Sequence, residues 1–168
     1  MLIRPAAAAD VPAILPMVAA ICALHESWDK DKYPFLPDIV ERYRYWFPQR
    51  IADPKSVFLV AELPTPTELP TSGGIGVPPV LPPLAGYLIA TVETEIPIYR
   101  LKHFGFIHDV WVEPRHRAQG IARHLVDAAV ARFAEMGLAQ VRLDTAAPNA
   151  AARRLFASCG FRESTTEM

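Results

Sequence analysis

The chain has 168 residues, of which 51% are hydrophobic and 21% are charged, and its formal net charge is −1. This length and composition suit one domain, residues 1–168, with a substantial core. A near-neutral net charge argues against a protein that binds mainly to nucleic-acid phosphates or to an anionic membrane surface, so we expect neither partner. The two cysteines, Cys22 and Cys159, lie far apart and no secretory signal is recognisable, which favours a reduced cytoplasmic protein.

The first predicted elements are a short edge strand at Met1–Arg4 and a helix at about Val11–Glu26. Apolar residues recur through this helix at steps of three and four, which indicates one buried face. Asp10 is at the expected N-cap position, and Pro12 falls in the first turn, where proline is tolerated. Cys22 lies on the apolar face and is expected in the core.

A loop rich in acids, aromatics and prolines follows at residues 25–37. Carboxylates and aromatic faces both attract cations, so this loop is a candidate wall for an amine pocket. The residues predicted to bind such a substrate are Glu26, Trp28, Asp29, Tyr33 and Phe35. The alternative is a solvated loop whose aromatic side chains are tucked onto the core.

The middle of the chain predicts a second short helix at about residues 39–47 and two strands, Ser56–Leu63 and Leu84–Glu95. Both strands are rich in β-branched and aromatic residues and are expected to pair antiparallel. Their connection, Pro64–Pro83, contains seven prolines and three glycines and cannot belong to either strand. We expect an exposed surface loop there, and a ligand for a proline-reading domain is the alternative.

The most informative stretch is an apolar strand at residues 106–112, a basic turn, and an amphipathic helix that ends near Gly137. Regular alternation would place His108 on one strand face and Asp109 on the other. A helix start presents unpaired amides and a positive dipole, and guanidinium groups provide paired donors. The turn at residues 115–122 is therefore expected to bind phosphates. A further strand at residues 140–146, a helix at 149–158 and a last strand after Phe161 complete the prediction.

Two motifs carry a family resemblance. The pattern Gln/Arg-x-x-Gly-x-Gly/Ala at the turn is matched by Arg117, Gly120 and Ala122. The pattern Asn-x-x-Ala-x-x-Leu-Tyr-x-x-x-Gly-Phe is matched, with phenylalanine in place of the tyrosine, by Asn149, Ala152, Leu155, Phe156, Gly160 and Phe161. At these residues the chain resembles the GNAT superfamily of acyl-coenzyme A N-acyltransferases.

The resemblance implies an α/β (α+β) fold with a mixed, mostly antiparallel central sheet of six to seven strands and about four flanking helices. It also implies direct transfer of an acetyl group from acetyl-coenzyme A to a primary amine of a small molecule or peptide, within one complex of both substrates. The segment after the first helix commonly walls the acceptor site in this family. The five histidines show no metal-site spacing, so no metal is expected, and an exposed edge strand would allow a homodimer.

The resemblance assigns the coenzyme A diphosphate to the turn and the thioester to the preceding strand. A bulge at Val110–Val112 is expected to turn a backbone amide toward the thioester oxygen, as in an oxyanion hole. The predicted cofactor-binding residues are Val110, Trp111, Val112, Arg117, Ala118, Gln119, Gly120, Ile121, Ala122, Arg123, Asn149 and Phe156. Arg115, Arg117 and Arg123 are alternatively ordinary surface charges, and Asn149 is alternatively a helix cap.

A primary ammonium, with a pKa of about 10.4, must lose a proton before it can attack. His108 lies where family members carry a basic glutamate or histidine, and Asp109 is the competing candidate. These two side chains and the Val112 amide form the predicted catalytic set. Phe156 replaces the tyrosine that commonly protonates the leaving thiolate, so the alternative function is a catalytically weak acyl-coenzyme A-binding sensor or regulatory module.

Overall fold

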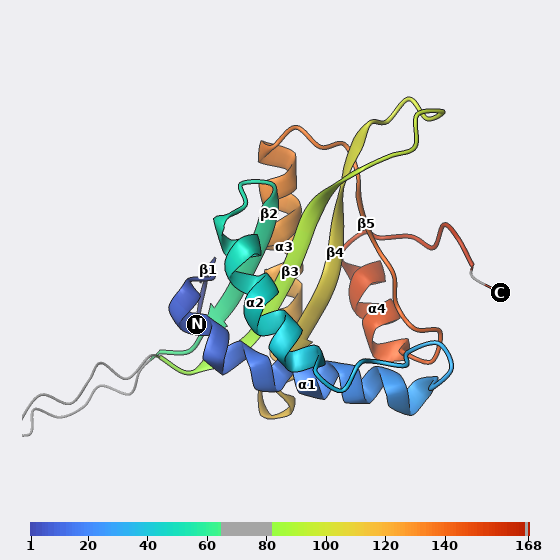
Figure 1. The fold of residues 1–168 in the computed structure, drawn as a ribbon. Helices are drawn as coiled ribbons and strands as arrows, with labels where there is room; N and C mark the ends of the chain where they lie inside the picture. Colours follow the sequence, from blue (N-terminus) through green and yellow to red (C-terminus); the bar gives the residue numbers. More distant parts are fainter. Residues whose placement is uncertain (65–81, 167) are drawn as a thin grey trace, which may run out of the picture.

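The structure is a computed structural model that describes residues 1–64, 82–166 and 168. Within these residues it contains one sheet with helices on both faces (Figure 1). The strands are β1 (Leu2–Pro5), β2 (Ser56–Glu62), β3 (Leu84–Thr94), β4 (His103–Val112) and β5 (Val141–Leu143). The helices are α1 (Val11–Trp28), α2 (Ile39–Ala52), α3 (Ile121–Glu135) and α4 (Ala150–Ser158), with 3-10 turns η1 (Ala8–Asp10) and η2 (Pro114–His116).

The strand order is β1-β2-β3-β4-β5; the first three pairings are antiparallel and the β4–β5 pairing is parallel. The prediction of a mixed, mostly antiparallel sheet with four flanking helices is confirmed. The prediction of six to seven strands is wrong, because the described residues form five. Residues 161–166 form no strand, and β5 is shorter than the segment predicted at 140–146.

Two apolar cores lie on opposite faces of the sheet. Helices α1 and α2 cover one face, where Ile14, Val18 and Phe47 are fully buried. Helix α3 packs on the other face through Leu125, Val126 and Phe133, together with α4 (Figure 1). By length and composition α1 could cross a membrane. Core helices of globular proteins can have the same length and composition, and seven residues of α1 are buried here.

A β-bulge changes which side chains of β4 share a face. Asp109 lies opposite Ile89 while Ile107 lies opposite Ala90, which leaves His108 as the extra residue. Consequently His108, Asp109 and Trp111 face α1 and α2, whereas Ile107 packs on the α3 side. The prediction that His108 and Asp109 occupy opposite faces is wrong, because it assumed an unbroken alternation.

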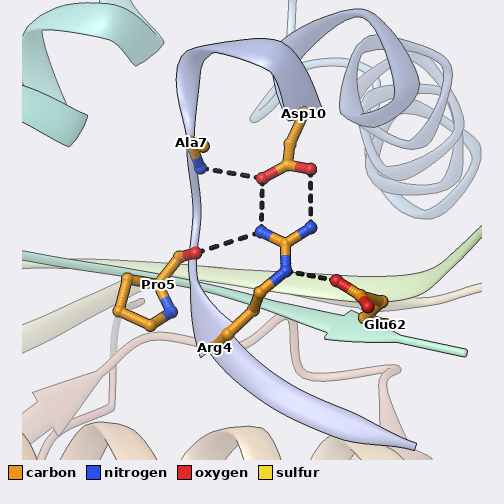
Figure 2. Close-up of polar contacts among 5 residues, drawn as sticks. All are labelled: Arg4, Pro5, Ala7, Asp10 and Glu62. Atoms are coloured by element: carbon orange, nitrogen blue, oxygen red, sulfur yellow. Dashed lines mark hydrogen bonds and ion pairs between the residues drawn. The ribbon is translucent and has the colours of Figure 1, made fainter. Parts of the chain in front are cut away.

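An ion cluster ties the N-terminus to the sheet (Figure 2). Arg4 donates to both carboxylate oxygens of Asp10, at 2.7 and 2.9 Å, and also to Glu62. The Ala7 amide donates to Asp10 at 2.7 Å, so this 2%-exposed carboxylate does not cap α1 as predicted. Burial alone would raise the pKa of Asp10, but the hydrogen bonds from Arg4 and Ala7 outweigh it, and the pKa is lowered.

The proline-rich connection predicted at Pro64–Pro83 falls mostly outside the described residues, since 65–81 are not described. Its two ends lie together, because the Leu63 amide donates to the Pro83 carbonyl at 2.9 Å. This bond continues the β2–β3 ladder by one step. Cys22 is buried, as predicted for a core residue.

Candidate active site

The sheet is open beside the second half of β4. Strand β5 pairs only with Gly105, Phe106 and Ile107, and its last residue, Leu143, lies opposite Ile107. Within the described parts of the chain, β4 from His108 to Val112 therefore has no strand partner on this edge. Figure 1 shows the chain leaving β5 toward α4 and diverging from β4 at this point. The result is a split in the sheet that begins at the bulge.

Two backbone amides point into this split. The Glu113 amide donates to the Ala85 carbonyl at 2.8 Å, so it points toward β3. Because amide directions alternate along a strand, Trp111 points the same way and Val110 and Val112 point toward the open edge. The Val112 carbonyl faces that edge too, where it accepts the Arg117 Nε–H at 2.9 Å.

The bulge that was expected to open this backbone lies at His108, not at Val110–Val112. Val110, Trp111 and Val112 keep regular register with β3. The missing strand on the other side, rather than a distortion of β4, is therefore what exposes their amides.

The turn before α3 contains two residues in the left-handed backbone conformation. Ala118 and Gly120 adopt positive φ angles of 61° and 79°. For alanine this costs roughly 1 kcal/mol, a strain typical of functional turns. Gly120 is the N-cap of α3 and no side chain caps the helix, so the first-turn amides, including those of Ile121 and Ala122, are directed at the space in front of the turn.

Arg117 joins the turn to the strand. Its guanidinium lies 4.7 Å from the centroid of the Trp111 ring while Nε–H holds the Val112 carbonyl. One edge of the guanidinium is thus used to fix the turn against β4. Arg123 lies on the first turn of α3 in an exposed ion pair with Asp127, at 3.6 Å.

Asp109 is a half-buried carboxyl group next to two tyrosines. The Tyr87 hydroxyl donates to Asp109 Oδ2 at 3.4 Å, and Tyr43 lies near enough to influence the pKa of this carboxyl group. Burial raises the pKa of Asp109 to about 6, although both tyrosines and nearby His25 act to lower it. Sequence reasoning missed Tyr43 and Tyr87, since aromatic residues on α2 and β3 gave no signal beyond ordinary core packing.

His108 lies next to Asp109 on the same side of the sheet. Its Nε2 atom is 2.6 Å from the Thr91 hydroxyl and 3.9 Å from Glu93, and its side chain is 31% exposed. Burial lowers the pKa of His108; Glu93 acts to raise it and Arg50 to lower it further. The structure therefore brings both predicted bases together at the beginning of the split.

The predicted substrate residues lie at the end of α1 and in the loop after it. The expectation that the loop begins at residue 25 is wrong, because α1 continues to Trp28 and includes Glu26. The Trp28 and Tyr33 rings lie against the imidazole of His25, with ring centroids 5.3 and 4.9 Å away, and Tyr33 stacks near Phe35 at 6.2 Å. Glu26 and Phe35 line a cavity of about 250 Å³ between α1 and the start of α2. Through His25 the cluster reaches the surroundings of Asp109.

Three predicted residues have clear structural roles. Asp29 accepts the backbone amides of Asp31 and Lys32, at 3.1 and 3.0 Å, and so stabilises a turn. Asn149 is the N-cap of α4, its side chain accepting the Ala152 amide at 3.1 Å, as the capping alternative predicted. Phe156 is 9% exposed and its ring lies 5.7 Å from that of Phe161, in the core on the α3 side.

The sequence model of the acetyltransferase (GNAT) family matches residues 21–161. The chain belongs to this family. GNAT acetyltransferases use acetyl-coenzyme A. No curated protein sequence matches the chain significantly.

Solved structures share the fold at low sequence identity. The chain is similar to the BH1408 protein of Bacillus halodurans, with a TM-score of 0.77 and 19% identity, covering 100% of this chain and 97% of that one. It is also similar to a predicted acetyltransferase with acetyl-CoA from Clostridium acetobutylicum. There the TM-score is 0.72 and the identity 18%, and the match covers 99% of this chain and 93% of that one. For an aminoglycoside 6'-N-acetyltransferase from Acinetobacter haemolyticus, the TM-score is 0.66 and the identity 18%, and the match covers 100% of this chain and 95% of that one. These identities establish the fold alone.

Proposed function

We propose that this GNAT protein transfers the acetyl group of acetyl-coenzyme A to a primary amine of a small molecule or peptide, by direct attack within a complex of both substrates. The observation that carries the proposal is the split beside β4. Within the described residues, it combines two backbone donors without a strand partner, at Val110 and Val112, with a helix start that no side chain caps and two titratable side chains, His108 and Asp109.

The chain's own groups suit acetyl-coenzyme A. The amides from Ala118 to Ala122, in front of the α3 N-terminus, receive the diphosphate, with the Arg117 and Arg123 side chains adding positive charge; the Arg117 amide itself donates to the Pro114 carbonyl. The Val112 amide, with that of Val110, donates to the thioester oxygen and stabilises the negative charge that grows on it during attack. Asn149 keeps α4 in place on the far side of the split through its cap.

Removal of the ammonium proton falls to His108 or Asp109. Both face the same side of β4, because the bulge turns them there. With a lowered pKa His108 is neutral near pH 7, and with a pKa of about 6 Asp109 is mostly ionised there, so either is able to accept a proton.

The leaving thiolate does not depend on Phe156. A thiol with a pKa of about 8.5 is a fair leaving group as its anion, so the missing tyrosine hydroxyl slows the reaction only modestly. The alternative, a weakly active acyl-coenzyme A sensor, is motivated by Phe156 alone and is not favoured.

The acceptor enters past the end of α1 and the loop that follows it in this proposal. Glu26 and the rings of Trp28, Tyr33 and Phe35 offer a carboxylate and aromatic faces to an ammonium group. A structural neighbour that acts on aminoglycosides supports a small-molecule amine as the acceptor class.

The test is incubation of the purified protein with acetyl-coenzyme A and a panel of polyamines, amino sugars, amino acids and peptides. Thiol release that requires the amine, with an acetylated product of the expected mass, supports the proposal. Saturable acetyl-coenzyme A binding without turnover of any amine would support the sensor instead.

A further inference from the structure

One hydrogen-bonded chain next to the split has no part in the fold's ladders. The Thr91 hydroxyl donates to Glu93 Oε1 at 2.5 Å and lies 2.6 Å from His108 Nε2. Thr91 is 5% exposed, and Thr91 and Glu93 both lie on β3, on the same face as His108. The imidazole is further confined by the rings of Phe106 and Trp46, with centroids 5.1 and 6.1 Å away.

Counting protons in this chain fixes the form of the histidine. A threonine hydroxyl has a single hydrogen, and an ionised carboxylate can only accept one. If Thr91 gives its hydrogen to Glu93, its oxygen can only accept from His108, so Nε2 must carry a proton. In the neutral ring Nδ1 is then the bare nitrogen. Within the described residues, Nδ1 of His108 has no hydrogen bond.

We propose that Thr91 and Glu93 are positioning residues that hold His108 as the Nε2–H tautomer, so that Nδ1 is the atom that accepts the proton of the acceptor ammonium. This rests on the proposed function. In the step, an N–H bond of the ammonium breaks, its electron pair stays on the amine nitrogen, and the proton forms a bond to Nδ1. The imidazolium keeps its Nε2–H bond to Thr91.

Charged side chains on three elements, β3, α2 and β4, influence how readily His108 accepts the proton. Glu93 on β3 is 3.9 Å from Nε2 and stabilises the imidazolium, while Arg50 on α2 opposes it. Asp109 follows on β4, and its carboxyl group accepts the Tyr87 hydroxyl. Removing the Glu93 charge should therefore lower the pKa of His108, and removing the Thr91 hydroxyl should release the ring.

The experiment has two readouts. Long-range ¹H–¹⁵N spectra of the imidazole ring report the tautomer of His108 directly, whether or not an amine is turned over. We expect the Nε2–H form in the wild type and in Thr91→Ser, and a mixture of tautomers in Thr91→Val. A wild-type spectrum showing the Nδ1–H form would overturn the proposal, even in an active enzyme.

Kinetics give the second readout. Thr91→Val should lower kcat about five- to tenfold, the size of one lost hydrogen bond, with the KM for acetyl-coenzyme A unchanged and with rescue by Thr91→Ser. Glu93→Gln should move the acidic limb of the kcat/KM profile to lower pH by about half a unit or less. Wild-type kcat and pH profile in Thr91→Val would overturn the proposal.

A matched control separates this role from general packing. Thr94 on the same strand contacts His103 Nδ1 at 3.4 Å in an exposed pair, so Thr94→Val removes a comparable threonine–histidine contact away from the split. It should leave both readouts unchanged, and an equal loss in Thr94→Val would count against the proposal. If no amine is acetylated at all, the proposed function fails while the ring spectrum still decides the tautomer.

Discussion

Replacing Asp109 by asparagine should stabilise the protein at alkaline pH. The folded-state pKa of Asp109 is about 6, against an ordinary value of 3.8. Because folding raises this pKa, the unfolded chain loses its proton first as the pH rises, and stability falls between about pH 4 and pH 6. The two pKa values differ by about two units, and each unit corresponds to about 1.4 kcal/mol. The ionised carboxylate therefore lowers the free energy of unfolding by roughly 3 kcal/mol relative to the protonated form.

Asparagine has nearly the same shape and no charge. It keeps one oxygen that can accept the Tyr87 hydroxyl, and the free-energy cost of losing the second oxygen does not depend on pH over this range. The comparison of variant with wild type at two pH values therefore isolates the charge. We expect Asp109→Asn to gain roughly 2 to 3 kcal/mol relative to wild type on going from pH 4 to pH 8.

The assay is urea denaturation of both proteins at pH 4 and pH 8, with the free energy of unfolding extrapolated to water. The exposed carboxylate Asp31 provides a control, since Asp31→Asn should change this energy by less than about 0.5 kcal/mol at either pH. An Asp109→Asn effect equal at the two pH values would show that burial does not disfavour the charge, and the account of Asp109 would fail.

Three further substitutions test other parts of the structure. Arg117→Glu should weaken acetyl-coenzyme A binding at least about tenfold in calorimetry. Arg132→Glu, at the other end of α3, is the control and should not weaken it. Unchanged affinity in Arg117→Glu would show that the phosphates bind elsewhere. His108→Ala should reduce kcat by about 10² or more near neutral pH, where His108 is neutral and the amine is still protonated, and should remove the acidic limb of the pH profile; a pH profile identical to wild type would exclude it as the base. Arg4→Met should destabilise the fold by roughly 3 to 5 kcal/mol in denaturation, because Asp10 would stay buried without its partner; a loss under 1 kcal/mol would contradict this.

The sequence predicted the helices and the long strands because their patterns are local. The apolar stripes of α1 and α3 and the β-branched runs of β2 and β3 each lie within one element, and all four elements formed where expected. The prediction of a last strand after Phe161 is wrong because it depends on distant residues. A short terminal segment forms a strand only if a sheet edge is available to pair with it, and no local pattern encodes that edge.

The site was predicted less completely than the fold. Motif residues such as Arg117 and Gly120 can be read one by one, and they lie at the turn as expected. The bulge at His108 cannot be read from composition, because it is a property of the β3–β4 register. The partners Tyr43 and Thr91 come from α2 and β3, so only tertiary packing brings them to the two candidate bases.

The most direct test of the whole account is a ¹H–¹⁵N NMR titration of the protein with acetyl-coenzyme A. We predict that the amide signals of Gly120, Ile121 and Ala122 shift through contact with the diphosphate, together with those of Val110 and Val112 at the open edge of β4. Saturable binding that leaves these five amides unmoved, and shifts signals elsewhere, would contradict the placement of coenzyme A in the split.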